Sequence, residues 1–163
     1  MGLLREQQSG CSVGPSIAEG FFLSDSTIDA ATIQAFRETE YRVHGDEPFT
    51  LWIGEASSVL AALHKRHGVD CSAYVTAHNP YSQALDDAAN ALRHAELGRE
   101  LGQRCLFAVE GVGRHPSNGW KGETSYLILG LTLEAAKVLG ARHEQNAIVW
   151  SDADAVPQLI LLR

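Results

Sequence analysis

Apolar residues follow two patterns along the chain: short continuous runs and stripes of helical period. The runs, typical of strands, occupy residues 41–44, 49–53, 72–78, 106–109, 124–131, 147–150 and 159–162. The stripes, typical of helices, occupy residues 28–36, 59–63, 85–95 and 133–140. Strand and helix patterns interleave, but hairpins interrupt a pure βαβ order. This predicts an α+β or mixed α/β fold, a single layered domain in which a mixed sheet of about six strands packs against three main helices.

Helix ends and faces are also indicated by the sequence. A Ser-x-x-Asp start places the first helix directly after Ser26, the second helix is expected to start near Ser57, and Thr132 is expected to cap the last helix. In the helix around residues 85–95, the apolar positions Leu85 and Leu92 are expected to face the core.

The first part of the chain differs in composition from the rest. Residues 1–24 are rich in Gly, Ser and Gln and carry no periodicity, so a flexible N-terminal tail is expected there, with no signal peptide. Residues 25–163 are expected to form a single globular domain, because 163 residues fit one domain of ordinary size.

Composition narrows the classes of partner. The net charge is −7, from 20 acidic and 13 basic residues, so nucleic-acid binding is not expected. No apolar run approaches the ~20 residues of a membrane-spanning helix, so no membrane association is expected. Three separated cysteines without a C-x-x-C pair indicate a reducing, cytoplasmic setting, with Cys71 and Cys105 reduced and buried.

A long loop is the most informative stretch. About a dozen residues from Gly111 onward, rich in Gly, Pro, Asn, His and Trp, separate two apolar runs, and loops of that length are often functional. Glu123 stands at its rim beside Trp120, and a carboxylate against an indole has the raised pKa that acid–base catalysis needs. The alternative is a solvated edge charge or an ion-pair partner for Arg114. His115 is a candidate proton shuttle, with a solvated loop histidine as the alternative.

Other polar residues stand where apolar runs end. Asn79 and Tyr81 follow the run 72–78, and Gln145 with Asn146 precede the run 147–150. Amide side chains donate and accept hydrogen bonds, so these residues are candidate ligand-binding groups. The alternatives are an Asx turn before Pro80 and termination of the preceding helix by Asn146.

Motifs for metals and cofactors are weak. His78, His115 and Glu123 lack the regular spacing of zinc ligands, so no metal site is expected. The segment after Gly111 begins like a dinucleotide-binding motif but has Pro116 in place of the third glycine, so no cofactor is expected either.

Three separated segments resemble a known family. They are residues 73–80 (Ala-Tyr-Val-Thr-Ala-His-Asn-Pro), 120–125 (Trp-Lys-Gly-Glu-Thr-Ser) and 145–149 (Gln-Asn-Ala-Ile-Val). In this order they are similar to a bacterial family of small uncharacterised proteins, domain of unknown function 3293. His78 departs from the aromatic residue expected before Asn-Pro. The resemblance implies a bacterial, cytoplasmic protein and supplies no catalytic or binding residues.

Two hypotheses of function follow. The first is a site for a small polar or nucleotide-like ligand, formed by Glu123, His115, Asn79, Tyr81, Trp120, Gln145 and Asn146, with turnover left open. The second is a non-enzymatic protein–protein interaction module, in which Trp120 and Tyr81 form the contact surface. Convergence of Glu123, Asn79 and Gln145 in one cleft favours the first, whereas a flat apolar patch around Trp120 favours the second.

Overall fold

The computed structural model describes residues 26–163, so the predicted tail and Cys11 lie outside the described residues. The elements in chain order are α1 (Ala30–Glu38), β1 (Glu40–Val43), β2 (Phe49–Leu51), α2 (Ser58–Arg66), β3 (Ser72–Thr76), the 3-10 turn η2 (Pro80–Ser82), α3 (Asp87–Gln103), β4 (Ala108–Arg114), β5 (Glu123–Leu129), α4 (Leu133–Arg142), β6 (Ala147–Ser151) and β7 (Pro157–Leu161). The predicted α+β class is confirmed, and the expected six strands and three main helices approximate what is found.

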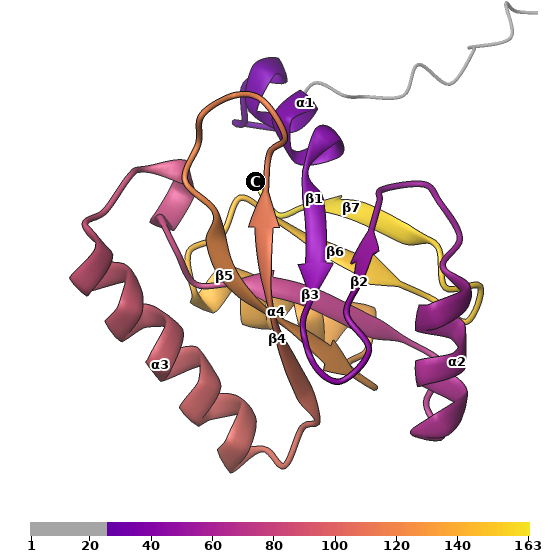
Figure 1. The fold of residues 1–163 in the computed structure, drawn as a ribbon. Coiled ribbons are helices and arrows are strands. Elements are labelled where there is room, and N and C mark those ends of the chain that lie inside the picture. Colours follow the sequence, from indigo (N-terminus) through magenta and orange to yellow (C-terminus); the bar gives the residue numbers. More distant parts are fainter. Residues whose placement is uncertain (1–25) are drawn as a thin grey trace, which may run out of the picture.

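The strands form one curled sheet in the order β2-β1-β4-β5-β3-β6-β7. Every neighbouring pair is antiparallel, so the expectation of a mixed sheet was wrong. Interleaved helices do not fix strand direction, because helices can also connect strands that are not neighbours. Figure 1 shows β1 and β4 running steeply and β3 and β7 nearly level. The curl brings the two edges together, where the Gly54 amide donates to the Pro157 carbonyl at 2.8 Å.

The outer face of the sheet carries the larger apolar core. Successive strand residues point to opposite faces, and alternate positions such as Val75, Ile128 and Ile148 point outward and are almost fully buried. Helices α3 and α4 cover this face through Leu97, Leu101, Ala136 and Leu139.

The inner face is covered less completely. Tyr74, Leu127 and Val149 point inward, and α2 packs on them through the fully buried Leu60. At one end of the sheet this face is roofed by α1 and the β4–β5 loop, which Figure 1 shows lying together. None of the residues of α1 is buried, so α1 covers this end without contributing a core side chain.

The helix starts agree in part with the sequence. Thr132 caps α4 as predicted, and α2 begins beside Ser57 as predicted, with both hydroxyl oxygens accepting hydrogen bonds from backbone amides of the first turn. α1 begins after Asp29 rather than after Ser26, because the Asp29 carboxylate accepts from both the amide and the hydroxyl of Thr32.

The predicted inner face of α3 was wrong. Leu92 is 73% exposed and Leu85 is exposed as well, whereas the buried positions are Asn90, Leu97 and Leu101. Apolar periodicity missed this face because its first turns carry polar side chains that are hydrogen-bonded to the site described below.

The long loop is also shorter than expected. β4 continues to Arg114, so the loop spans residues 115–122. Gly111 lies within this strand. The position requires glycine because a Cβ there would stand 2.1 Å from the Arg42 carbonyl oxygen and 2.8 Å from the Tyr74 hydroxyl. This glycine allows β1 and β4 to pair closely and leaves room for the side chain of Tyr74, so it belongs to the strand and not to the loop.

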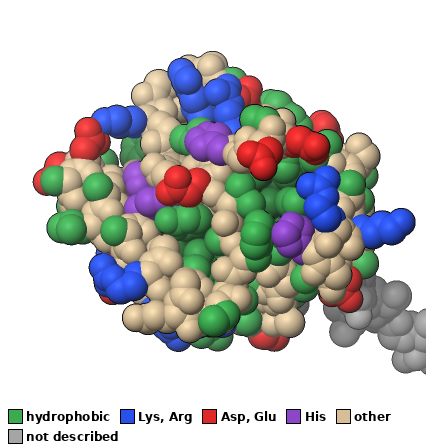
Figure 2. All heavy atoms as spheres, turned by 60° about the horizontal axis from the view of Figure 1, so that its bottom comes forward, with side chains coloured by type: hydrophobic (Ala, Val, Ile, Leu, Met, Phe, Trp, Pro, Cys, Tyr) green, Lys and Arg blue, Asp and Glu red, His purple; other side chains and the backbone are tan. Residues whose placement is uncertain are grey.

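The thiols and the surface complete the description. Cys71 is buried and free, as predicted, while Cys105 is free but exposed, so its predicted burial was wrong. Cys105 follows α3 with a φ of 53°, at a surface turn. On the face in Figure 2, acidic and basic side chains are interspersed among exposed hydrophobic ones. Within residues 26–163, no helix has the length and apolar character needed to cross a bilayer.

Candidate functional site

A cavity of about 340 Å³ lies on the inner face, beneath α1 and the β4–β5 loop. It stands where β3 and β4 end and where β1, β5 and β6 begin, a single end of the antiparallel sheet. Polar lining comes from Thr32, Thr39, Tyr41, Tyr74, Thr76, Asn79, Ser82, His115, Asn118, Trp120, Glu123, Ser125, Gln145 and Asn146. All of the predicted site residues except Tyr81 therefore line one cavity.

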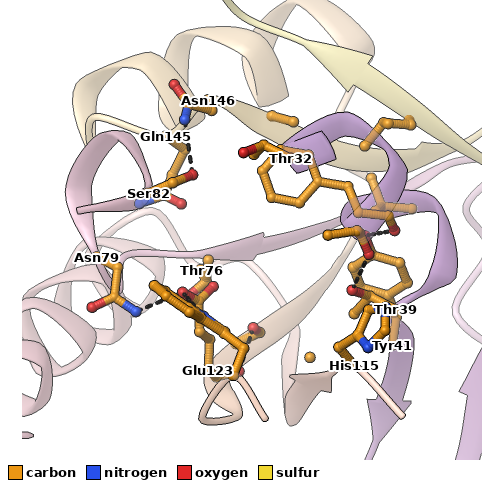
Figure 3. Close-up of a pocket in the computed structure, with 18 of the residues that line it drawn as sticks. Thr32, Thr39, Tyr41, Thr76, Asn79, Ser82, His115, Glu123, Gln145 and Asn146 are labelled. Atoms are coloured by element: carbon orange, nitrogen blue, oxygen red, sulfur yellow. Dashed lines mark hydrogen bonds between the residues drawn. The ribbon is translucent and has the colours of Figure 1, made fainter. Parts of the chain in front are cut away.

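Figure 3 shows how these groups surround the cavity. Asn79, Thr76 and Glu123 lie on one side, Thr39, Tyr41 and His115 on the opposite side, and Ser82, Gln145 and Asn146 along a third. Segments distant in sequence thus converge on a space that a small molecule would fill, within the usual size range of ligand pockets.

Glu123 is the carboxylate of this cavity. Its Oε1 accepts from Asn79 Nδ2 at 2.7 Å and from the Trp120 indole at 3.3 Å. Burial raises the pKa of Glu123 above its ordinary value, and the two hydrogen bonds offset only part of that rise. Since both bonds use the same oxygen, Oε2 makes no hydrogen bond within residues 26–163 and is the oxygen left for a ligand.

Asn79 holds the carboxylate in place. Its Oδ1 accepts from the Leu85 amide and from Asn90 Nδ2, and its own backbone amide donates to Asn90 Oδ1. Asn90, on the polar face of α3, is therefore paired twice with Asn79. The Asx turn expected before Pro80 does not form, because Oδ1 accepts from Leu85 and the Tyr81 amide donates to the Glu144 carbonyl instead.

The turn after β3 has an unusual backbone. Asn79, Tyr81 and Ser82 all have positive φ, at 47°, 51° and 61°. Residues other than glycine adopt a positive φ only at a cost in conformational free energy, and such residues cluster at functional sites.

A second turn supports this backbone. The Tyr81 amide donates to the Glu144 carbonyl at 2.7 Å, and Gln145 Nε2 donates to the carbonyls of His78 and His143. Arg93 of α3 joins the same two turns, donating to the carbonyls of Ala77 and His143. The ends of β3 and α4 are thereby fixed relative to each other.

Asn146 and Tyr81 occupy the rim. Asn146 Nδ2 donates to Ser82 Oγ at 2.8 Å. Tyr81 is 41% exposed and lies outside the cavity lining, with the Arg163 guanidinium over its ring at 4.2 Å. The structure thus separates Tyr81 from the other predicted residues.

His115 lines the cavity, but both of its ring nitrogens are engaged. Nδ1 accepts from the amides of Ser117 and Asn118, so Nε2 carries the proton and donates to Glu38 at 2.8 Å. The pKa of the Glu38 carboxyl is lowered mainly by a hydrogen bond from Gln34 and to a smaller extent by one from His115. In this arrangement His115 joins the loop to α1, and neither nitrogen is free for proton transfer.

Two tyrosines of the cavity were missed by the sequence analysis. Tyr41 and Tyr74 are buried, and their rings meet edge to face with centroids 5.4 Å apart. Burial raises the pKa of both phenols, and for Tyr41 the Glu123 charge adds to the rise. Aromatic residues in strands look like ordinary core. The available signal was Gly111, the strand glycine that makes room for Tyr74.

The charge of the lining is one-sided. Among the described residues that line the cavity, Glu123 is the carboxylate, and there is no lysine or arginine. A second hollow of about 520 Å³ lies beyond Asn79 and Trp120, which line both spaces, and it contains His78, His94 and the Lys121–Asp87 ion pair. Within residues 26–163, no group of three or more His, Cys, Asp or Glu side chains is arranged to hold a metal ion.

Comparison with known proteins gives one match. Residues 75–148 match the model of a family described as "Protein of unknown function (DUF3293)", which confirms the resemblance seen in the sequence. No significant match is found among curated proteins or among solved structures. The matched segment contains Asn79, Glu123 and Gln145, whereas α1 and Tyr41 lie outside it.

Proposed function

We propose that this chain, whose residues 75–148 match the model of the family of proteins of unknown function DUF3293, binds a small polar molecule in the cavity beneath α1. The observation that carries the proposal is Glu123. Its carboxylate is held at one oxygen by Asn79 and Trp120, its pKa is raised by burial, and it stands beside an open volume of about 340 Å³. Its Oε2 has no hydrogen-bond partner among residues 26–163, which leaves it available to a ligand in this volume.

The lining narrows the ligand. Phosphate groups are usually held by arginine, lysine or a helix N-terminus. The described lining residues contain neither cation, and the N-terminus of α1, which borders the cavity, is already capped by the Asp29 carboxylate. The nucleotide-like ligand expected from the sequence is therefore narrowed to a molecule without phosphate, such as a base or a nucleoside. The volume suits a ligand of that size.

Glu123 is also the candidate for proton transfer. Its raised pKa brings it closer to neutral pH, the condition for general acid or base catalysis. His115 instead has a positioning role in this proposal, because its nitrogens bind the loop and Glu38.

The alternative, a protein interaction module, has less support. Trp120 is 44% exposed, but its indole donates to Glu123 over a hollow rather than standing in a flat patch. Tyr81 lies under Arg163 and does not line the same cavity. The expectation of a bacterial cytoplasmic protein belongs to this proposal too, supported by the family resemblance and by the free Cys71 and Cys105.

The test is a binding screen with a variant that fills the cavity. Full-length protein is titrated with bases, nucleosides and small amines, and binding is followed by thermal shift and NMR. Ala35→Phe places a ring in the cavity from α1, and Ala61→Phe places the same ring on the exposed side of α2. We expect Ala35→Phe to abolish binding and Ala61→Phe to retain it.

Two results would contradict the proposal. One is a screen in which no compound perturbs the cavity residues of the wild-type protein. The other is a ligand whose affinity is the same in Ala35→Phe and in Ala61→Phe, because such a ligand binds elsewhere.

A further inference from the structure

We infer that the ligand of this cavity is an organic cation that donates N–H bonds, with an ammonium or amidinium group placed at Glu123. This rests on the proposed function and gives it a chemical class. Most polar groups in the lining no longer have a proton to donate to a ligand.

Most hydroxyl groups of the lining donate their protons to backbone carbonyls. A carbonyl oxygen can only accept, so a hydroxyl within bonding distance of it must be the donor. This holds for Thr39 to the Ala35 carbonyl (2.7 Å), Tyr41 to Phe36 (2.6 Å), Tyr74 to Arg42 (2.8 Å), Thr76 to Thr124 (2.8 Å) and Ser125 to Glu123 (3.0 Å). Each of these oxygens therefore has only lone pairs left to present to a ligand.

Several N–H groups are used in the same way. Gln145 Nε2 donates both of its protons to the carbonyls of His78 and His143, so only its Oε1, an acceptor, remains for a ligand. The indole of Trp120 donates to Glu123, and the ring of His115 donates to Glu38. Ser82 is an exception, since it accepts from Asn146 and keeps its own proton at the rim. The side-chain amides of Asn79 and Asn146 each keep a second proton, and Asn118 Nδ2 makes no hydrogen bond within residues 26–163.

Acceptors outnumber donors in this lining, so it favours a ligand that donates. A molecule whose polar groups are mainly acceptors would place lone pairs against most of these oxygens and leave them desolvated. The charge points the same way, because Glu123 faces the cavity without a cationic side chain among the described lining residues. The rings of Phe36, Tyr41, Tyr74 and Trp120 also line the cavity, and aromatic faces attract cations.

The experiment compares three probes of nearly the same size. Phenethylamine, phenethyl alcohol and phenylacetate differ in being a cation, a neutral molecule and an anion. Their dissociation constants for the full-length protein are measured by NMR at pH 7. We expect the amine to bind at least about tenfold more tightly than the alcohol, and the anion not to bind.

Substitution of Glu123 tests the group itself. In Glu123→Gln, the carbonyl oxygen is expected to take the place of Oε1, since Asn79 and Trp120 both donate there. The new amide nitrogen then points into the cavity as a donor. We expect Glu123→Gln to lose the preference for the amine, with the alcohol bound as tightly or more tightly. Glu96→Gln removes the same charge from an exposed position on α3 and should change nothing.

The outcomes separate this inference from the proposed function. Equal or tighter binding of the alcohol or the anion in the cavity of the wild-type protein overturns the inference and leaves a ligand site. Failure of all three probes and of the wider screen overturns both. If Glu123→Gln does not fold, the wild type is titrated instead. Amine binding must then weaken as falling pH protonates Glu123 while alcohol binding does not, and parallel curves overturn the inference.

Discussion

The two faces of the curled sheet use the same strands for different purposes. On the outer face, Val75, Ile128 and Ile148 are buried beneath α3 and α4. On the inner face, at the end beneath α1, neighbouring residues such as Tyr74, Thr76 and Ser125 line an open volume, with their hydroxyl groups bonded to the backbone. The outer face is packed against helices, whereas the inner face combines a packed core with an open site at one end, where the polar groups are already oriented.

This difference has an energetic meaning. Burial of apolar area is the main source of folding free energy, and α1 contributes little of it because none of its residues is buried. The cavity end should therefore open more readily than the outer core.

The largest effect is expected from a pair of identical substitutions on the two sides. Ile128→Ala deletes a fully buried side chain and should lower the free energy of unfolding by about 2–5 kcal/mol. Ile33→Ala, on the half-buried face of α1, should cost about 1 kcal/mol or less. Urea denaturation measures both. Equal losses would show that α1 is as much part of the core as β5.

A smaller effect is expected at the hub of the site. Asn79→Ala leaves the Leu85 amide and Asn90 Nδ2 without their acceptor, so it should lower stability by about 2 kcal/mol. Asn79→Gly makes the same deletion but tolerates a φ of 47°, so it should be less harmful by roughly 1 kcal/mol. Identical melting curves for the two variants would mean that the backbone at residue 79 is unstrained.

The smallest effect concerns the pH dependence of stability. The folded-state pKa of Glu123 lies above its ordinary value of 4.5, so the folded protein holds this proton more tightly than the unfolded chain. That contribution is fully present below about pH 4.5 and is lost as pH rises through the raised pKa.

The measurement is urea denaturation across pH. Relative to wild type, Glu123→Gln should gain stability as pH rises above 4.5, whereas Glu96→Gln should follow the wild-type curve. A wild type that loses no stability relative to Glu123→Gln over this range would refute the raised pKa.

The sequence predicted one class of residue in this site well. Asn79, Glu123, Gln145 and Asn146 stand at the ends of apolar runs, where a polar side chain is conspicuous, and the structure places all of them in the cavity lining. Their role in binding a ligand stays a prediction.

Residues in ordinary positions were harder to assign. Tyr41 and Tyr74 satisfy the strand pattern as core residues, so nothing local marks them as cavity floor. Asn90, Arg93 and His94 caused the opposite error, because polar residues on the inner face of α3 shifted the apolar stripe toward the exposed Leu92. Periodicity assumes that inward means apolar, and it fails where a helix faces a polar network.

The hydrogen bonds from lining hydroxyl groups to main-chain carbonyls limit how ligand specificity can change among relatives of this protein. The hydroxyl groups of Tyr41, Tyr74 and Thr76 donate to main-chain carbonyls, which remain when neighbouring side chains are substituted. The preference of the lining for a ligand that donates hydrogen bonds is therefore kept as long as the backbone is kept. Position 123 is different, because glutamate and glutamine fill the same space and their codons differ by a single nucleotide. A relative with glutamine there would keep this fold and select the opposite kind of ligand, so position 123 is where a change of specificity is most accessible to mutation.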